Sequence, residues 1–396
     1  MKVGGTIYLD HQATTPVDPR VFEKMAAAFT YEFGNPHASE HVIGWRAAEA
    51  IATSALQVAS LVGADPDEVI FTSGATEANN LALLGLADHA ERSGRRKILL
   101  SAIEHKSVLA AGRVLARRHG LDVATVRVDR HGRVDEAALA AQLNEGGVLL
   151  VSILAVNNEI GTIQAVNRIG ALAGAAGALF HCDAAQAPCA IDVGDLLQNA
   201  DLISLSSHKI YGPSGIGALI ARRGVQPLLT PLIHGGGQQN GLRSGTLPLP
   251  LCIGFGAAAE LLSGDSANEE RDRVRACRDL FIETLLAEGC VVVANGPDNA
   301  SRHPGNANLL LRGIAAADLL AALQPTLAAS SGSACTSGIP EPSHVLRAIG
   351  LTGDEADCSI RFSFGRSTTA HEALEAARAV AAAVDRISDG TIRATL

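Results

Sequence analysis

The sequence predicts an α/β protein with two lobes, and three observations lead to that prediction. Short, nearly continuous apolar runs recur through the middle of the chain, as in strands that are buried on both faces. Ala-rich helical patterns separate several of these runs, and such alternation is typical of a mostly parallel sheet with right-handed crossovers. The length of 396 residues corresponds to about two domains of roughly 100–200 residues each.

We expect the following elements along the chain. The buried strands lie at 69–73, 97–103, 123–128, 148–156, 178–182 and 202–206, and the clearest helices between them at 75–90, 106–118 and 168–176. Residues 215–221 follow a turn so closely that a hairpin is expected, which adds an antiparallel strand. A helical stretch at 252–288 then leads to a smaller C-terminal unit with strands near 290–293 and 308–311.

Composition excludes several classes of protein. Hydrophobic residues make up 47% of the chain, which suffices for a large core and excludes disorder. The formal net charge of −9 argues against a nucleic-acid-binding surface, so no direct binding of nucleic acid is expected. The first residues lack the apolar segment of a secretory signal, and no apolar run reaches the ~20 residues of a membrane span. We therefore expect a cytoplasmic protein without a membrane anchor.

The seven cysteines are odd in number and show no Cys-x-x-Cys spacing. This pattern excludes a disulfide scaffold or a zinc ribbon and suits a reducing compartment, so no metal site is expected. Free cysteines usually behave as small buried hydrophobic residues, which is our expectation for six of the seven. Cys335 differs because it stands among Ser, Gly, Ala and Thr at 331–338, a composition typical of an exposed loop.

Polar segments follow three of the predicted strands, at the carboxyl ends where ligands of parallel sheets usually bind. In the first, Ser73-Gly74-Ala75-Thr76-Glu77, the backbone N–H groups and the Thr76 hydroxyl can hold a phosphate, although such a turn is more often a plain helix cap. The second ends a strand with Asp183. This carboxylate either caps the next helix or holds a protonated heterocyclic nitrogen such as a pyridinium.

A third polar segment, 204–213, places Lys209 directly after a buried strand and before a Gly-Pro break. Desolvation and neighbouring cations lower the pKa of such a lysine and make its amine a nucleophile toward carbonyl groups. Phosphate-binding turn, pyridine-nitrogen carboxylate and Schiff-base lysine, in that order, predict a pyridoxal phosphate site. The combination is far more specific than any of its parts.

Six motifs also make the chain resemble a known family. They are Thr-Ser-Gly-Ala-Thr-Glu at 72–77, Glu-His-Lys at 104–106, Val-Asn-Asn-Glu-Ile-Gly at 156–161, Ser-Ser-His-Lys-Ile-Tyr-Gly-Pro at 206–213, Arg-Ser-Gly-Thr at 243–246 and Ser-Gly-Ser-Ala-Cys-Thr-Ser-Gly at 331–338. From residue 7 to residue 363 the sequence closely resembles the cysteine desulfurases, in the class V aminotransferase-like branch of fold type I pyridoxal phosphate enzymes. The segment around Cys335 is similar to the group with a longer cysteine loop.

The resemblance implies a fold and a set of cofactor contacts. The large domain would span 14–262 around a mostly parallel, seven-stranded-type sheet, and a smaller α+β domain would combine 1–13 with 263–396 and carry the cysteine loop. Lys209 would bind the cofactor covalently, and Asp183 would keep its pyridine nitrogen protonated. Gln186 would hydrogen-bond the ring oxygen. His105 would stack on the ring and move protons, although a lone histidine after a strand is more often a core residue.

The resemblance further assigns the phosphate and the substrate. The phosphate would be held by the backbone at Gly74 and Ala75, by the side chains of Thr76, Ser206 and His208, and by Thr246 from the second subunit of a homodimer. The carboxylate of L-cysteine would bind Arg361 and Asn157, with Asn35 as a weaker candidate for the same pocket.

Cys335 would decide the reaction. The resemblance implies conversion of L-cysteine to L-alanine, in which Lys209 removes the α-proton and the Cys335 thiolate takes the sulfur as a persulfide. An acceptor protein would then receive the sulfur, for iron–sulfur cluster assembly or thiolation. Two departures from the family bear on that acceptor: Gln239-Asn240 stands where a Glu-Arg pair is common, and the C-terminal segment is short.

Three alternatives stay open on the sequence. A selenocysteine lyase or an aminotransferase would share the fold, and the aminotransferase would need an amino acceptor but no cysteine loop. A non-catalytic scaffold is the third alternative, and the intact set of Lys209, Asp183, His105 and Cys335 disfavours it.

Overall fold

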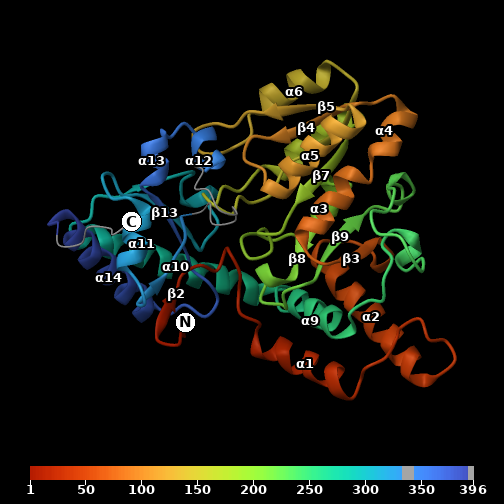
Figure 1. Ribbon diagram of the computed structural model, residues 1–396, viewed down its shortest axis with the longest axis horizontal. Coiled ribbons are helices and arrows are strands. Elements are labelled where there is room, and N and C mark those ends of the chain that lie inside the picture. Colours follow the sequence, from red (N-terminus) through yellow and green to blue (C-terminus); the bar gives the residue numbers. More distant parts are fainter. Residues whose placement is uncertain (332–342, 391–396) are drawn as a thin grey trace.

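The computed structural model describes residues 1–331 and 343–390, and Figure 1 shows a larger and a smaller part. A seven-stranded sheet with the order β3-β9-β8-β7-β6-β4-β5 forms the centre of the larger part. Its strands are β3 (Val69–Thr72), β4 (Lys97–Ser101), β5 (Asp122–Val126), β6 (Val148–Ser152), β7 (Leu179–Asp183), β8 (Leu202–Ser206) and β9 (Gly217–Ala221). Only β9 runs antiparallel to its neighbours, which confirms the α/β class and the predicted hairpin.

Helices cover both faces of this sheet because alternate strand residues point to opposite sides. Ile98 and Leu100 of β4 pack with one set of helices, and Leu99 packs with the other. The first set is α3 (Ala75–Leu84), α4 (Ala87–Ser93) and α5 (Lys106–His119). The second set is α1 (Pro19–Thr30), α2 (Val42–Leu61), α6 (Glu136–Asn144), α7 (Val166–Ala175), α8 (Leu196–Asn199) and α9 (Leu249–Glu260).

The smaller part is an α+β unit with its own hydrophobic cluster. Its antiparallel sheet consists of β10 (Val293–Ala294), β11 (Asn306–Leu310) and β13 (Ser359–Ser363). Against it pack α10 (Asp265–Ala287), α11 (Ala316–Ala322) and α14 (Ala370–Ser388). Ile7 and Leu9 join the same cluster, and β2 (Thr6–Tyr8) pairs with both β1 (Lys2–Val3) and β12 (Leu327–Ala328). The N-terminal residues therefore pack with the C-terminal part, while the limits 14–262 stay a prediction.

Three predicted elements differ in the structure. The helix expected at 75–90 breaks at Gly85, whose carbonyl oxygen accepts from Thr230 N at 2.8 Å and where a Cβ would lie 2.4 Å from Leu81 O. The stretch at 252–288 is two helices, α9 and α10, separated at Gly264, whose φ is +88°. The strand expected near 290–293 is reduced to Val293–Ala294, because the chain turns at Gly289 with φ +88°.

Two short helices, α12 (His344–Ala348) and α13 (Gly353–Asp357), pack against loops of the larger part rather than on the smaller sheet. Val345, Leu346 and Ile349 contact Ile103, Leu154 and Ile160, which follow strands β4 and β6. The segment after residue 342 therefore lies beside the loops that extend from the carboxyl ends of these strands. Within the ranges that the structure describes, no helix is long and apolar enough to cross a membrane.

Candidate active site

Lys209 lies in a single turn of 3-10 helix, Ser207–Lys209, at the carboxyl end of β8. Its Nζ donates hydrogen bonds to the backbone oxygens of Gln12 at 2.6 Å and Ala13 at 2.7 Å. Thr15 reinforces this attachment, because its N and Oγ1 both donate to His208 O at 2.9 Å. The amine is therefore half-buried and held against the N-terminal segment, as expected for a lysine that is not a solvated surface group.

The chain leaves this turn through a strained residue. Tyr211 has φ +67°, a left-handed conformation that costs a bulky side chain about 1–3 kcal/mol. Gly212 follows because a Cβ at that position would lie 2.1 Å from Ser207 Oγ. The Tyr-Gly-Pro break noted in the sequence is therefore a tight, strained turn that directly follows the lysine.

Asp183, at the end of β7, is 6% exposed and belongs to a continuous hydrogen-bond network. Its Oδ2 accepts from Asn79 Nδ2 at 2.7 Å, and Asn79 Nδ2 also donates to Ser107 Oγ at 2.9 Å. Ser107 Oγ lies 2.7 Å from His105 Nδ1. Asp183 Oδ1 accepts from Ala185 N at 3.0 Å, so the carboxylate also caps the following turn. We call the four residues Asp183, Asn79, Ser107 and His105 the Asp183–His105 network.

His105 begins α5 as its N-cap residue, with Nδ1 accepting from Ser107 N at 3.2 Å. Burial lowers the pKa of His105, and Lys209 and Lys106 lower it further, while Asp183 acts in the opposite direction. The imidazole is therefore neutral at neutral pH. Because Nδ1 accepts, the ring proton lies on Nε2, a state suited to stacking and proton transfer.

The turn at 73–76 leaves backbone donors open at the start of α3. Gly74 is the N-cap residue and provides no side-chain cap, and a Cβ built on it meets no atom within 4 Å. The first N–H groups of a helix attract anions through their free donors and the helix dipole. Thr76 is exposed beside them, Ser206 is buried at the end of β8 and His208 is half-buried. Burial, together with Lys209, lowers the pKa of His208 to about 4, so its ring is neutral.

The loop before Thr246 is fixed at two points near this turn. Arg243 donates to both carboxylate oxygens of Glu77, at 2.8 and 3.2 Å, and Glu77 accepts from Ser73 N at 2.7 Å. Gln239 pairs with the free edge of β3: it accepts from Phe71 N at 2.7 Å and donates to Phe71 O at 2.9 Å. The departure from the family at position 239 is therefore a side chain that closes the sheet edge. Thr246 itself is exposed.

The three candidates for the substrate carboxylate lie in different environments. Arg361 is 3% exposed and donates to Asp10 Oδ1 at 2.6 Å and Asn158 O at 2.8 Å, while its buried Nε has no partner among the described residues. Asn157 is fully buried, donates to Ile103 O and accepts from Glu159 N and Ile160 N, so it orders its own loop. Asn35 is exposed in a local turn, where it accepts from His37 N.

The sequence analysis missed several residues that connect these groups. Gln12 O accepts from Lys209 Nζ and from Gln186 Nε2 at 2.8 Å, while Gln12 Oε1 accepts from Asn306 Nδ2 at 2.7 Å. Asn79 and Ser107 complete the Asp183–His105 network, and Asp10 pairs with Arg361. Asn79 gave a usable signal: an amide on the apolar face of a helical pattern needs a buried partner. Gln12 gave none, since its role comes from its backbone oxygen.

Cys335 lies outside the described residues, but the residues on either side of the gap are attached to the site. Ser330 and Arg361 exchange two backbone hydrogen bonds, at 3.1 and 2.7 Å. After the gap, Ser343 Oγ donates to Glu159 Oε2 at 2.5 Å, and His344 Nε2 lies 2.9 Å from Glu104 O. Burial raises the pKa of Glu159 to about 7, although the Ser343 hydrogen bond acts in the opposite direction.

The other six cysteines are free. Cys182, Cys252, Cys277 and Cys290 are buried, as the sequence analysis expected. The expectation was wrong for the two others, because Cys189 and Cys358 are half-buried. Cys189 Sγ donates to Lys209 O at 3.4 Å, at the border between the larger part and α10. Burial raises the pKa of Cys189 to about 12, so it stays a thiol at neutral pH.

The donor set fits pyridoxal phosphate. The N–H groups of Ala75 and Thr76 at the start of α3 suit a phosphate, and the buried Asp183 carboxylate suits a protonated ring nitrogen. His105, neutral and tied to the same carboxylate through Asn79 and Ser107, suits the face of an aromatic ring. Lys209 supplies the amine that a Schiff base requires.

Comparison with known proteins agrees with this chemistry. The family model "Aminotransferase class-V" matches residues 7–375. A curated relative from Rickettsia typhi, "Cysteine desulfurase IscS", is 43% identical over 96% of this chain and 92% of its own length. Among solved structures, a NifS-like protein from Rickettsia africae matches with a TM-score of 0.82 and 30% identity, covering 97% of this chain and 99% of that one. "SspA in complex with cysteine" matches with a TM-score of 0.78 and 35% identity, covering 92% and 100%.

Proposed function

The chain belongs to the aminotransferase class-V family and, within it, to the cysteine desulfurases, and we propose that Lys209, His105 and Cys335 are its catalytic residues. The enzyme depends on pyridoxal phosphate. The observation that carries the assignment is the position of Lys209 Nζ, held at the carboxyl end of β8 by Gln12 O and Ala13 O. Of the other described lysines, only Lys106 also follows a strand of the large sheet at its carboxyl end, and it is the first residue of α5.

Each residue has a task that its surroundings support. Pyridoxal phosphate, when bound, supplies an electron sink for the α-carbon of an amino acid. Asp183 would hold its ring nitrogen, and Gly74, Ala75, Thr76, Ser206 and His208 its phosphate. Gln186, beside Gln12, would contact the ring oxygen. The Lys209 amine takes the α-proton of L-cysteine, and the neutral His105 ring moves protons at its Nε2.

The sulfur step belongs to Cys335. Its thiolate attacks the substrate sulfur, so a sulfur–sulfur bond forms on Cys335 while the carbon–sulfur bond of the substrate breaks, and the carbon skeleton leaves as L-alanine after protonation. The Ser330–Arg361 and Ser343–Glu159 contacts support this role, because they attach both sides of the cysteine segment to residues around the site. Arg361 supports the substrate end: its Nε has no partner among residues 1–331 and 343–390, and a planar guanidinium matches a carboxylate.

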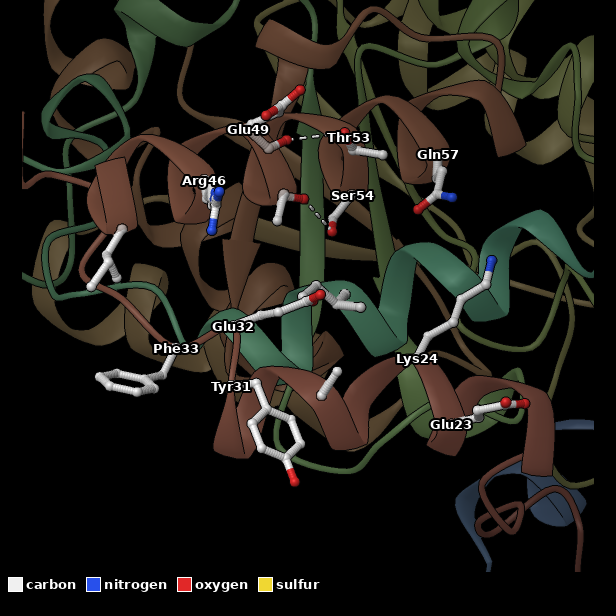
Figure 2. A pocket seen from close by; sticks show the side chains of 14 residues that line it. Glu23, Lys24, Tyr31, Glu32, Phe33, Arg46, Glu49, Thr53, Ser54 and Gln57 are labelled. Atoms are coloured by element: carbon white, nitrogen blue, oxygen red, sulfur yellow. Dashed lines mark hydrogen bonds between the residues drawn. The ribbon is translucent and has the colours of Figure 1, made fainter. Parts of the chain in front are cut away.

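A homodimer with shared sites completes the proposal. The chain has 13 aromatic residues: nine Phe, one Trp and three Tyr. Five of them are more than half exposed on α1, α2 and the connection between these helices: Phe22, Phe29, Tyr31, Phe33 and Trp45. A hollow of about 700 Å³ is lined by residues of α1, α2, their connection and α9, with Tyr31 and Phe33 among them. Figure 2 shows these two side chains projecting from the connection between α1 and α2.

A second copy of the chain is the occupant we propose for this face. Isolated exposed apolar residues are common, but a cluster of large aromatic side chains marks an interaction surface. The exposed Asn35 and Thr246 fit the same proposal, because each would contribute to the neighbour's site instead of its own. The acceptor of the persulfide is a protein of iron–sulfur cluster assembly or thiolation, and the enzyme works in the cytoplasm.

Substitution of the two proposed reactive residues tests the assignment. Lys209→Ala should abolish formation of alanine from cysteine, because it removes both the cofactor attachment and the α-proton base. Cys335→Ser should still bind cysteine and change the absorbance of the cofactor, but it should form no protein persulfide. Alanine formation at near wild-type rate in Lys209→Ala refutes the lysine, and normal sulfide release from Cys335→Ser refutes the cysteine. Turnover that depends on a keto acid favours an aminotransferase, and activity confined to selenocysteine favours the lyase.

A further inference from the structure

The strained Tyr211 is held in its conformation by residues of the smaller part. Its hydroxyl oxygen accepts a hydrogen bond from Arg366 N at 2.5 Å, and the guanidinium carbon of Arg366 lies 4.2 Å from the centre of its ring. Gly365 completes the contact, since a Cβ there would lie 2.6 Å from the Tyr211 hydroxyl oxygen. The segment 365–366 therefore holds both the hydroxyl group and the face of the tyrosine ring.

Arg366 is fixed on its other side by two carboxylates. It donates to Asp18 Oδ2 and to Glu270 Oε2, both at 2.7 Å, and its side chain is only 13% exposed. Asp18 closes the arrangement, because its backbone N donates to Tyr211 O at 2.9 Å. Segments from the N-terminus, from α10 and from the end of β13 thus meet at one tyrosine.

These contacts lead directly to the lysine. Tyr211 stands two positions after Lys209, so its backbone angles set the course of the chain that leaves the lysine turn. Thr15 Oγ1 accepts from Tyr211 N at 2.8 Å while Thr15 N donates to His208 O, which ties the same turn on both sides of Lys209. Arg366 also follows β13, the strand that carries Arg361.

We propose that Arg366 and Tyr211 are positioning residues for Lys209. Arg366 holds Tyr211 in the left-handed conformation, and this conformation fixes the turn from which the lysine amine reaches the α-proton of the substrate. The inference rests on the proposed function, because it takes Lys209 as the catalytic amine. It gives the smaller part a second role, in addition to carrying Arg361: it holds the base of the reaction in place.

Two variants and a matched control test the inference. Arg366→Lys keeps the positive charge but loses the fork that joins Asp18 to Glu270, and Tyr211→Phe removes only the acceptor of the Arg366 N–H. Arg223→Lys is the control, since Arg223 also joins two carboxylates, Asp65 and Asp67, each at 2.6 Å. Arg223 follows the end of β9, where Ala221 pairs with Leu202 at the start of β8. Lys209 follows the other end of β8, so Arg223 lies far from it along the strands.

Two measurements report on the position of the lysine. The first is kcat and KM for L-cysteine in the cofactor-loaded enzyme. The second uses the full chain stripped of cofactor and follows acetylation of Lys209 by acetic anhydride with mass spectrometry, relative to the exposed Lys24. Because small misplacements of a catalytic group carry large penalties, Arg366→Lys should lower kcat about tenfold or more with KM changed less than about threefold. Its Lys209 labelling should rise relative to Lys24. Tyr211→Phe should shift both readouts in the same direction by about threefold.

The outcomes separate this inference from the proposed function. If both variants keep kcat and Lys209 labelling within twofold of wild type, the positioning role is refuted. Equal losses in Arg223→Lys also refute it, because the effect is then one of general stability. Tyr211→Phe, which keeps the ring, decides the question if Arg366→Lys does not fold. An active Lys209→Ala variant refutes the proposed function, whatever the other variants do. If Lys209→Ala is inactive while Arg366→Lys and Tyr211→Phe behave as wild type, only the positioning role is refuted.

Discussion

The Asp183–His105 network and the exposed candidates Asn35, Thr76 and Thr246 differ sharply in environment. In the network every member has a hydrogen-bond partner within the same chain, from β7 through α3 to α5. The exposed residues lie on loops and at a helix start, and Asn35 accepts from His37 N within its own turn. The difference teaches that, if the proposed roles hold, one chain would set the electrostatics of the cofactor ring by itself, whereas Thr76 and Thr246 at the phosphate end would gain their partners only from a ligand or a second subunit.

The physical consequence is a difference in what a substitution does. A buried charge in a low-dielectric network interacts strongly with its partners, so a change there affects chemistry. An exposed hydroxyl that gains a partner only on binding affects affinity instead. The following predictions test this division, and they run from the largest expected effect to the smallest.

Asp183→Asn should leave the fold and the shape of the site intact but lower kcat for alanine formation about 10²–10³-fold, as loss of a preorganised electrostatic group does in other enzymes. An amide cannot stabilise a protonated ring nitrogen. Steady-state kinetics with L-cysteine measure the loss. Asp201→Asn is the matched control, because Asp201 accepts from Phe180 N at 2.8 Å near the opposite end of β7. A comparable loss in both variants would assign the effect to the strand and not to the site.

Thr246→Ala should weaken cofactor binding about ten- to a hundredfold, the equivalent of one charge-assisted hydrogen bond of ~1.5–3 kcal/mol. The informative form is a mixed dimer with Lys209→Ala in one subunit and Thr246→Ala in the other. If Thr246 acts across the interface, one site carries both changes and the site that retains Lys209 binds the cofactor with wild-type affinity. Weak binding at that site, or an active monomer, contradicts the shared site.

The positions of the buried polar groups at strand ends could be predicted from the sequence, whereas the contacts that hold these groups could not. Lys209 and Asp183 are recognisable because each follows an apolar run, and the sheet topology brings such strand ends together. The breaks at Gly85 and Gly264 depend on what packs against the helix, which local pattern does not contain. Gln12 could not be found at all, since it acts through its carbonyl oxygen and any residue supplies that group.

Asn79→Ala sharpens the comparison from inside the network. It removes the donor to Asp183 Oδ2 and Ser107 Oγ and leaves both buried acceptors short of a partner, so kcat should fall about tenfold, or roughly 1.4 kcal/mol. Cofactor affinity should change much less than in Thr246→Ala. Asn199→Ala serves as the control, because it loses a hydrogen bond of 3.0 Å from Asn199 Nδ2 to Asn167 Oδ1 away from the site. A loss of affinity without a loss of kcat would place Asn79 with the exposed residues.

Ser343→Ala should have the smallest effect, and it tests whether the residue that follows the cysteine segment belongs with the buried group. Ser343 is the N-cap of α12 and donates to the buried Glu159; Thr352 is the N-cap of α13 and makes no contact with Glu159. Each Ala variant should lose about 0.5–2 kcal/mol of stability with its cap. Only Ser343→Ala should also slow persulfide formation, by about threefold, because only it frees the segment that carries Cys335 from the loop that carries Asn157.

Rapid mixing with L-cysteine separates the steps of this last prediction. Substrate binding, followed by the absorbance of the cofactor, should be unchanged in both variants, while sulfur transfer, followed by trapping of the Cys335 persulfide, should slow in Ser343→Ala alone. Equal slowing in Thr352→Ala would mean that helix stability governs the step. Unchanged transfer in both would mean that the Ser343–Glu159 contact is structural, and the cysteine segment would then depend on its Ser330–Arg361 attachment for its approach to the substrate.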